Sequence, residues 1–328
     1  MNEYIFSFMK KLALTVLTFF ITFLSGKAGT ASDSLKNEIP ITLTTKTGVI
    51  YGTLLLPVLK KPAPVVLMIA GSGPTDRNGN NMMMTNNSSK LLAEGLYNNT
   101  IATVRYDKRG IGESKAAGKK EEDLRFDDYV SDAVEWIKLL KADKRFSKVI
   151  VFGHSEGSLI GMVAANTGKA DGYISAAGAG QPADVILKIQ MKSQPAGVYE
   201  MVAPILDSLK QGKLVKNVDP MLNFLARPSV QPYMISWLKY DPQVEISKLS
   251  IPVLILQGTT DIQVSPEDAR ALSSANKKAK LVLIEGMNHV FKEATADRQQ
   301  NITTYTNPTL PVVPALIKNV VDFVQAVR

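Results

Sequence analysis

The chain has 328 residues, of which 45% are hydrophobic and 21% charged, with a formal net charge of +8 and no cysteine. Such values are typical of a globular protein with one large domain and an insertion, or with two domains, and exclude a disordered or fibrous chain. With no cysteine, two histidines and lysines in scattered pairs, the sequence predicts no disulfide, no metal site and no nucleic-acid partner.

The first residues have the layout of a secretory signal peptide. A lysine pair at 10–11 precedes an apolar stretch at 12–24, and small residues follow. This pattern predicts a signal peptide over 1–31, with cleavage after Ala28 or Ala31. The apolar stretch is shorter than the roughly 20 residues that a membrane helix needs. We therefore expect an exported protein, periplasmic or extracellular, without a stable membrane anchor after processing; an uncleaved anchor is the alternative.

Strands and helices alternate along most of the remaining chain. Short β-branched and apolar runs indicate strands, and apolar residues at helical spacing indicate helices. The alternation predicts an α/β protein with a mostly parallel central sheet covered by helices on both faces. The predicted strands are 38–45, 49–58, 63–71, 101–107, 148–153, 172–178, 251–258 and 279–286, and the predicted helices are 88–99, 126–141, 155–166, 315–327 and one that Ser265 caps.

The segment 181–250 interrupts this alternation. It contains seven prolines and no convincing strand, so it reads as several short helices, and it is too long for a loop in a compact domain. We expect a helical cap inserted into a core of 37–180 and 251–328. Its methionine and aromatic side chains, with Met234 and Trp237 as the candidates for substrate contact, either build the core of the cap or line a pocket.

A single serine stands between two glycines in "GHSEGS", directly after a predicted strand and at the start of a predicted helix. This context is typical of a strained strand-to-helix turn that exposes a nucleophilic hydroxyl. Ser155 is therefore the candidate nucleophile. Side chains at Gly153 and Gly157 would clash with the neighbouring strand and helix.

A serine hydroxyl needs a base, and a third group must orient that base. The chain offers two histidines: His154, beside the serine, which we expect to pack behind the turn, and His289, which follows the last predicted strand. Asp261 follows the preceding strand in the same way. Taken alone, His289 would be interpreted as an ordinary loop histidine and Asp261 as a turn aspartate. Together, Ser155, Asp261 and His289 all stand at carboxyl ends of strands, where open α/β sheets place their sites.

Developing negative charge on the substrate needs two N–H donors. The backbone N–H of Glu156, immediately after the nucleophile, is one candidate. The glycine-rich loop "AGSGPTDRNGN" after the 63–71 strand supplies the other, with Ser72 first and Gly73 as the alternative.

Two other segments stand out. In "RYDKRGIGES" (105–114) we expect Asp107 and Arg109 to brace the sheet through buried ion pairs; binding of a charged substrate is the alternative. The methionine run in 81–87 is either a loose loop or an apolar lip of the acyl pocket, since methionine adapts to irregular ligands.

On these motifs, with "QGTTDIQV" and "EGMNHVF" added, the chain resembles the α/β-hydrolase superfamily over about 37–328. It is similar to capped serine hydrolases of the bacterial esterase and serine-aminopeptidase type. The resemblance implies hydrolysis of a small-molecule acyl ester through an acyl-enzyme, without a cofactor, and gives Ser155, Asp261 and His289 the triad roles. Ser158 is a departure, because many relatives have glycine there.

Two rival functions stay open at this point. One is a peptidase that releases an amino acid or dipeptide. The other is a binding protein that has kept the fold and lost catalysis. The oligomeric state is not predicted.

Overall fold

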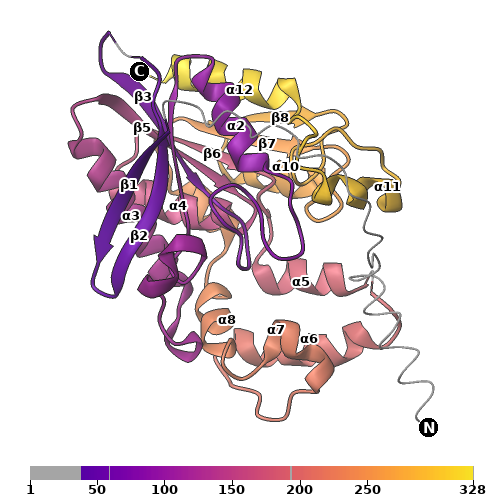
Figure 1. Ribbon diagram of the computed structural model, residues 1–328. Coiled ribbons are helices and arrows are strands. Elements are labelled where there is room, and N and C mark those ends of the chain that lie inside the picture. Colours follow the sequence, from indigo (N-terminus) through magenta and orange to yellow (C-terminus); the bar gives the residue numbers. More distant parts are fainter. Residues whose placement is uncertain (1–37, 59, 193, 328) are drawn as a thin grey trace, which may run out of the picture. The chain divides into compact units, whose positions relative to one another are not determined.

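Eight strands form one sheet in the computed structural model, which describes residues 38–58, 60–192 and 194–327 (Figure 1). The order across the sheet is β1-β2-β4-β3-β5-β6-β7-β8. The predicted signal peptide over 1–31 lies outside the described residues. The strands are β1 (Glu38–Thr45), β2 (Gly48–Leu55), β3 (Ala63–Ile69), β4 (Ala102–Tyr106), β5 (Phe146–His154), β6 (Gly172–Ala176), β7 (Val253–Gly258) and β8 (Lys280–Ile284).

The directions of the strands place the candidate site. β1 and β2 form an antiparallel hairpin, and β2 is also antiparallel to β4. From β4 to β8 all neighbours are parallel. The sequence prediction of a mostly parallel sheet is confirmed. Because parallel strands end at the same edge, the loops after β3, β5, β7 and β8 meet there.

Helices cover both faces of the sheet. They are α2 (Ser88–Tyr97), α3 (Phe126–Ala142), α4 (Glu156–Gly168), α5 (Ala183–Lys192), α6 (Val198–Lys210), α7 (Asn223–Ala226), α8 (Gln231–Trp237), α9 (Pro242–Ser247), α10 (Pro266–Ala275), α11 (Arg298–Thr303) and α12 (Pro314–Ala326). Short 3-10 turns lie at Gly112–Ala117, Glu121–Asp123, Pro220–Leu222 and Thr304–Thr306. α10 begins with the capping box that the sequence predicts at Ser265.

Alternate residues of β5 face the two helical layers. Val151 is buried in one cluster with Ile160 of α4, and α3 packs beside α4 on that face. On the other face a Cβ added to Gly172 would meet both Ile150 and Val327, which follows the end of α12. α2 packs against α12. β5 therefore has no solvated face, which accounts for its unbroken apolar run.

The charged run after β4 braces this core. Asp132 of α3 accepts two hydrogen bonds from Arg109, the Nε–H bond at 2.7 Å. Asp107 accepts a bond of 2.7 Å from Arg77, and all of these groups except Arg77 are buried. The bracing role that the sequence predicts for 105–114 is confirmed.

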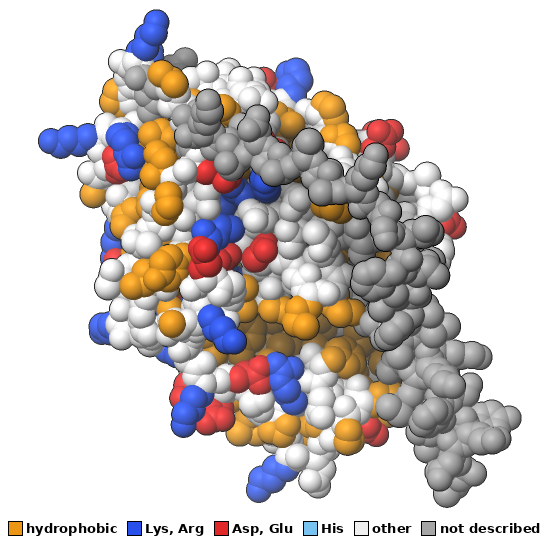
Figure 2. All heavy atoms as spheres, viewed as in Figure 1, with side chains coloured by type: hydrophobic (Ala, Val, Ile, Leu, Met, Phe, Trp, Pro, Cys, Tyr) orange, Lys and Arg blue, Asp and Glu red, His pale blue; other side chains and the backbone are white. Residues whose placement is uncertain are grey.

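Between β6 and β7 the chain is helical and contains no strand among the described residues. α5 packs on α6, and α8 packs on α3 and α6, whereas α9 packs on α4 and α10. Figure 2 shows a hollow lined by hydrophobic side chains among the helices α5 to α8, which lie below the sheet layer in this view. Of the helices described, none has the length and apolar content to cross a membrane.

Candidate active site

The turn after β5 places Ser155 in a backbone conformation that L-residues rarely adopt, with φ 55° and ψ −121°. The two flanking glycines make this turn possible. A Cβ on Gly153 would lie 2.2 Å from the Gly157 carbonyl oxygen, and one on Gly157 would lie 2.4 Å from the carbonyl oxygen of Ile69. The steric requirement predicted for both glycines is confirmed. The strain is of the kind found at functional sites.

Asp261 and His289 come together across the loops after β7 and β8. Nδ1 of His289 lies 2.8 Å from Oδ2 of Asp261, and both side chains are buried. A carboxylate only accepts, so Nδ1 carries the proton and donates it. Nε2 of His289 is then left with its lone pair available to accept a proton.

The carboxylate of Asp261 is held by further donors. Oδ1 accepts the backbone N–H groups of Gln263 (2.8 Å) and Val264 (3.0 Å). Oδ2 also accepts a bond of 3.0 Å from Nε2 of Gln257. Burial by itself would raise the pKa of Asp261, but the His289 ring and these N–H groups more than offset it and hold the pKa below its usual value. Asp261 is therefore an ionised, fully bonded acceptor.

Sequence reasoning missed Gln257. The only signal was a polar side chain near the end of an otherwise apolar strand, four residues before the aspartate. Its amide is buried and also donates to the carbonyl oxygen of Val264, so it fixes the turn that carries Asp261.

Ser155 and His289 line the same small cavity, of about 50 Å³. No hydrogen bond joins Ser155 Oγ to His289 Nε2 in the described part of the chain. Such bonds are often long before substrate binds and shorten in the complex. The structure thus brings the predicted nucleophile, base and acid to one edge of the sheet.

His154 lies behind the turn, as the sequence predicts. Its Nε2 is 2.9 Å from the backbone carbonyl oxygen of His289, so Nε2–H donates to it. The ring contacts the rings of His289 and Phe291. Loss of solvation, and then repulsion from His289, lower the pKa of His154 to about 3. This histidine is a neutral donor that supports the His289 loop.

The candidate oxyanion donors border the same space. Glu156 is the first residue of α4, so its N–H has no partner within the helix. Ser72 lines two cavities together with Ser155. The next residue, Gly73, has a φ of +70°, in the left-handed region that favours glycine. Among the described residues, the N–H groups of Ser72, Gly73 and Glu156 donate no backbone hydrogen bond. Both Ser72 and Gly73 remain candidates for the second donor.

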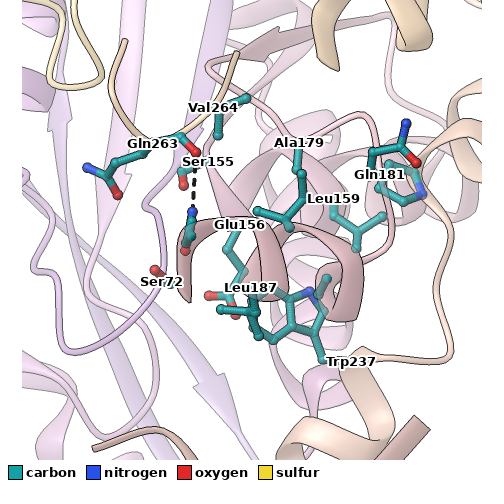
Figure 3. Close-up of a pocket in the computed structure, with 14 residues that line it drawn as sticks. Ser72, Ser155, Glu156, Leu159, Ala179, Gln181, Leu187, Trp237, Gln263 and Val264 are labelled. Atoms are coloured by element: carbon teal, nitrogen blue, oxygen red, sulfur yellow. Dashed lines mark hydrogen bonds between the residues drawn. The ribbon is translucent and has the colours of Figure 1, made fainter. Parts of the chain in front are cut away.

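Two larger cavities both border Ser72 and Glu156, and Ser155 lines the first of them. One, of about 100 Å³, is lined mainly by apolar side chains that include Leu159, Leu187 and Trp237 (Figure 3). The other, of about 580 Å³, is lined by Ser72, Met234 and Trp237 among others. Both cap residues singled out in the sequence thus line cavities, and both also pack in the core cluster.

Ser158 and the methionine run have clear places in the structure. The Ser158 hydroxyl lies 2.8 Å from the hydroxyls of both Tyr173 and Ser175, so it joins a buried polar cluster beneath the turn. In the methionine run, Met82 is 99% exposed, whereas Met84 lines the small cavity with Ser155. Only part of that run faces the site.

The fold is that of the α/β hydrolases. The chain is similar to Est1E from Butyrivibrio proteoclasticus with bound ferulic acid (19% identity, 84% of this chain and 96% of that chain, TM-score 0.56). It is similar to the α/β hydrolase GrgF from Penicillium sp. sh18 (18%, 88% and 98%, TM-score 0.57). It is also similar to the enol-lactonase from Burkholderia xenovorans LB400 (16%, 87% and 100%, TM-score 0.53).

A family model described as "Serine aminopeptidase, S33" matches residues 82–247, about half of the chain, and the chain belongs to this family. Among curated proteins it is similar to Esterase EstD from Thermotoga maritima, with 29% identity over 248 residues. That match covers 73% of this chain but 57% of EstD, so the chain spans little more than half the length of this relative.

Proposed function

We propose that the chain is a serine hydrolase that cleaves a carboxylic ester through an acyl-enzyme, with Ser155, Asp261 and His289 as its triad. The observation that carries the proposal is His289, bonded to Asp261, on the same cavity as a serine in a strained turn. The similarity to an esterase adds support.

The geometry supports a reaction in two steps. Nε2 of His289 accepts the hydroxyl proton as Ser155 Oγ attacks the ester carbonyl carbon. The carbonyl oxygen becomes an oxyanion, bound by the N–H of Glu156 and that of Ser72 or Gly73. When the intermediate collapses, the C–O bond breaks and the alcohol takes the proton from His289. Water then attacks the acyl-enzyme by the same steps, and the carboxylic acid leaves.

The charges beside Ser155 favour an ester over a peptide with a free amine. An aminopeptidase needs an acidic group available to hold that amine. Of the described side chains that line the cavity of about 100 Å³, Glu156 alone is acidic. It is already bonded to Tyr233 (2.6 Å) and paired with Lys108 (3.6 Å).

The two cavities that border Ser72 and Glu156 suggest where the halves of the substrate bind. The apolar cavity of about 100 Å³ suits a short acyl chain, and the larger one of about 580 Å³ suits the alcohol. We therefore propose a small or medium acyl ester as substrate.

The test is a screen of p-nitrophenyl esters of increasing chain length beside aminoacyl anilides. Ester turnover and labelling by a fluorophosphonate should both vanish in Ser155→Ala, with an unchanged circular dichroism spectrum. Ser247→Ala, at an exposed serine of α9, serves as the matched control and should keep both. Labelling that persists in Ser155→Ala would refute the nucleophile, and turnover of anilides alone would favour the peptidase.

We also propose that the protein is exported, on the strength of the lysine pair and apolar stretch within 1–31. Intact-mass measurement of secreted material should give an N-terminus at Gly29 or Ser32. A full-length chain retained in the membrane fraction would instead indicate an anchor.

A further inference from the structure

We propose that Lys108 is a positioning residue of the oxyanion hole, whose ammonium group fixes the two peptide groups that bind the oxyanion and links them to Tyr233 of the cap. The inference rests on the ester-hydrolase function proposed above. Lys108 follows β4, between the bracing residues Asp107 and Arg109, and is 1% exposed.

The first contact of Lys108 is with the loop after β3. Its Nζ donates a hydrogen bond of 2.6 Å to the carbonyl oxygen of Gly71. That carbonyl belongs to the same peptide group as the N–H of Ser72. The peptide is trans, so its C=O and N–H point in opposite directions. A bond that fixes the oxygen therefore also fixes the direction of the Ser72 N–H. A charged donor on the oxygen also polarises the peptide and makes its N–H a stronger donor.

The second contact is with the residue after the nucleophile. Nζ of Lys108 lies 3.6 Å from Oε2 of Glu156, with both side chains at most 4% exposed. The backbone N–H of Glu156 is the other candidate oxyanion donor. Figure 3 shows Ser72 and Glu156 below Ser155 among the residues that line the pocket. One ammonium group therefore connects the two segments that must stay in register around the oxyanion.

The cap completes the network. The hydroxyl of Tyr233 in α8 donates a hydrogen bond of 2.6 Å to Oε1 of Glu156. Lys108 also lies over the ring of Tyr129, 5.0 Å from its centroid. Burial lowers the pKa of Lys108, and the Glu156 carboxylate opposes that shift. The Glu156 carboxylate therefore offsets part of what burial costs the Lys108 ammonium group.

The neighbouring peptide provides an internal comparison. The hydroxyl of Thr75 donates a bond of 3.0 Å to the carbonyl oxygen of Ser72, which shares its peptide group with the N–H of Gly73. If Ser72 supplies the oxyanion donor, Lys108 is the group that orients it. If Gly73 supplies the donor, Thr75 takes that role.

The experiment measures kcat and KM on a short p-nitrophenyl ester. It also measures the affinity for a trifluoromethyl ketone, which forms a tetrahedral adduct whose oxyanion occupies the proposed oxyanion hole. Lys108→Met alone would leave Glu156 buried and unpaired, so the main variant is Lys108→Met/Glu156→Gln, which keeps the Glu156 N–H. We expect kcat and ketone affinity to fall together by about 10²-fold, comparable to the loss of one oxyanion donor, with KM within threefold of wild type.

Two milder variants keep the test decisive if the double variant does not fold. Tyr233→Phe leaves the Lys108–Glu156 pair intact and should lower kcat three- to tenfold without changing the preference between short and long esters. Thr75→Val should lower kcat less than threefold.

Four results would count against the proposal. A folded double variant with wild-type kcat, a loss confined to KM, or an unchanged kcat with altered chain-length preference in Tyr233→Phe would overturn it. A larger loss in Thr75→Val than in the Lys108 variant would assign the donor to Gly73 and overturn it as well. All of these presuppose that the wild type hydrolyses the ester and Ser155→Ala does not. If the wild type is inactive, the proposed function fails first, and the inference with it.

Discussion

The carboxyl edge of the sheet and the cap hold their side chains in different ways. At the sheet edge, the Asp261 carboxylate accepts four hydrogen bonds and Ser155 sits in a turn that only two glycines permit. The cap faces the same space mainly with apolar side chains, such as Leu187 and Trp237. Hydrogen bonds and backbone sterics impose one geometry, whereas apolar packing accommodates several. Substitutions at the edge should therefore change the rate of the reaction, and substitutions in the cap should change which substrate is preferred.

The largest effect is expected at the sheet edge. Asp261→Asn replaces the charged carboxylate that accepts the Nδ1–H bond of His289 with a neutral amide. His289 is then no longer held in the tautomer that leaves Nε2 free, and its cation loses the stabilising negative charge. We expect kcat to fall on the order of 10⁴-fold, as in comparable triads, which is roughly 5 to 6 kcal/mol of barrier. Steady-state kinetics, with the thermal midpoint as a check on folding, measures it.

Two other acids serve as controls for Asp261. Glu285 is exposed just after β8. Asp171 accepts the N–H of Val149 and pairs with Lys141, near the amino ends of β5 and β6 and away from the site. If Asp261→Asn keeps more than about a tenth of the activity while Glu285→Gln or Asp171→Asn does not, the triad is wrong.

A smaller effect is expected from His154. The folded protein keeps this ring neutral, with a pKa of about 3 against an ordinary value of 6.5. Between these two pH values the unfolded chain binds a proton that the folded chain does not. Stability therefore falls as pH drops below about 6.5, by up to about 1.4 kcal/mol per pH unit. His154→Gln keeps an N–H donor for the His289 carbonyl but cannot titrate, so its unfolding free energy should depend less on pH from 6.5 to 4. Equal slopes in urea titrations of both proteins would contradict this.

The smallest effect is expected in the cap. Trp237 lines the apolar cavity and stacks with Phe126 at 6.4 Å between ring centroids. Trp237→Ala should enlarge the proposed acyl pocket and raise kcat/KM for long esters relative to short ones by up to about tenfold, near 1.4 kcal/mol. Leu214→Ala, at a cap residue that is 61% exposed, is the control and should leave the ratio unchanged. An unchanged ratio in Trp237→Ala would mean that this side chain serves the core of the cap.

Local patterns were enough to predict much of the fold. Strands such as β5 are short apolar runs, and α10 carries its own capping signal, so neighbouring residues specify both. The turn at Ser155 was predictable for the same reason, because its two glycines and its place between strand and helix are local features. The positions of Asp261 and His289 were predicted from the rule that open α/β sheets place their sites at the carboxyl ends of strands.

Contacts between distant segments could not be predicted in this way. Tyr233 and Glu156 are 77 residues apart, and Lys108 and Gly71 are 37 apart. Periodicity tells which face of an element is buried, but not which polar group meets another across two layers. Gln257 was missed for a related reason, since a strand pattern does not show that a buried amide turns toward its own following loop.

The φ of 55° at Ser155 has a thermodynamic consequence. A residue with a Cβ in this region raises the energy of the native state by about 1–3 kcal/mol, whereas glycine adopts it freely. Glycine also has a larger chain entropy in the unfolded state, which lowers the stability of the folded protein by about 0.5–1 kcal/mol. Because this cost is smaller than the strain that is relieved, Ser155→Gly should melt at a higher temperature than the wild type, although it should be inactive. Selection for stability alone would place glycine at this position, and with Ser155 as the proposed nucleophile, resistance to heat and turnover of substrate favour different residues here.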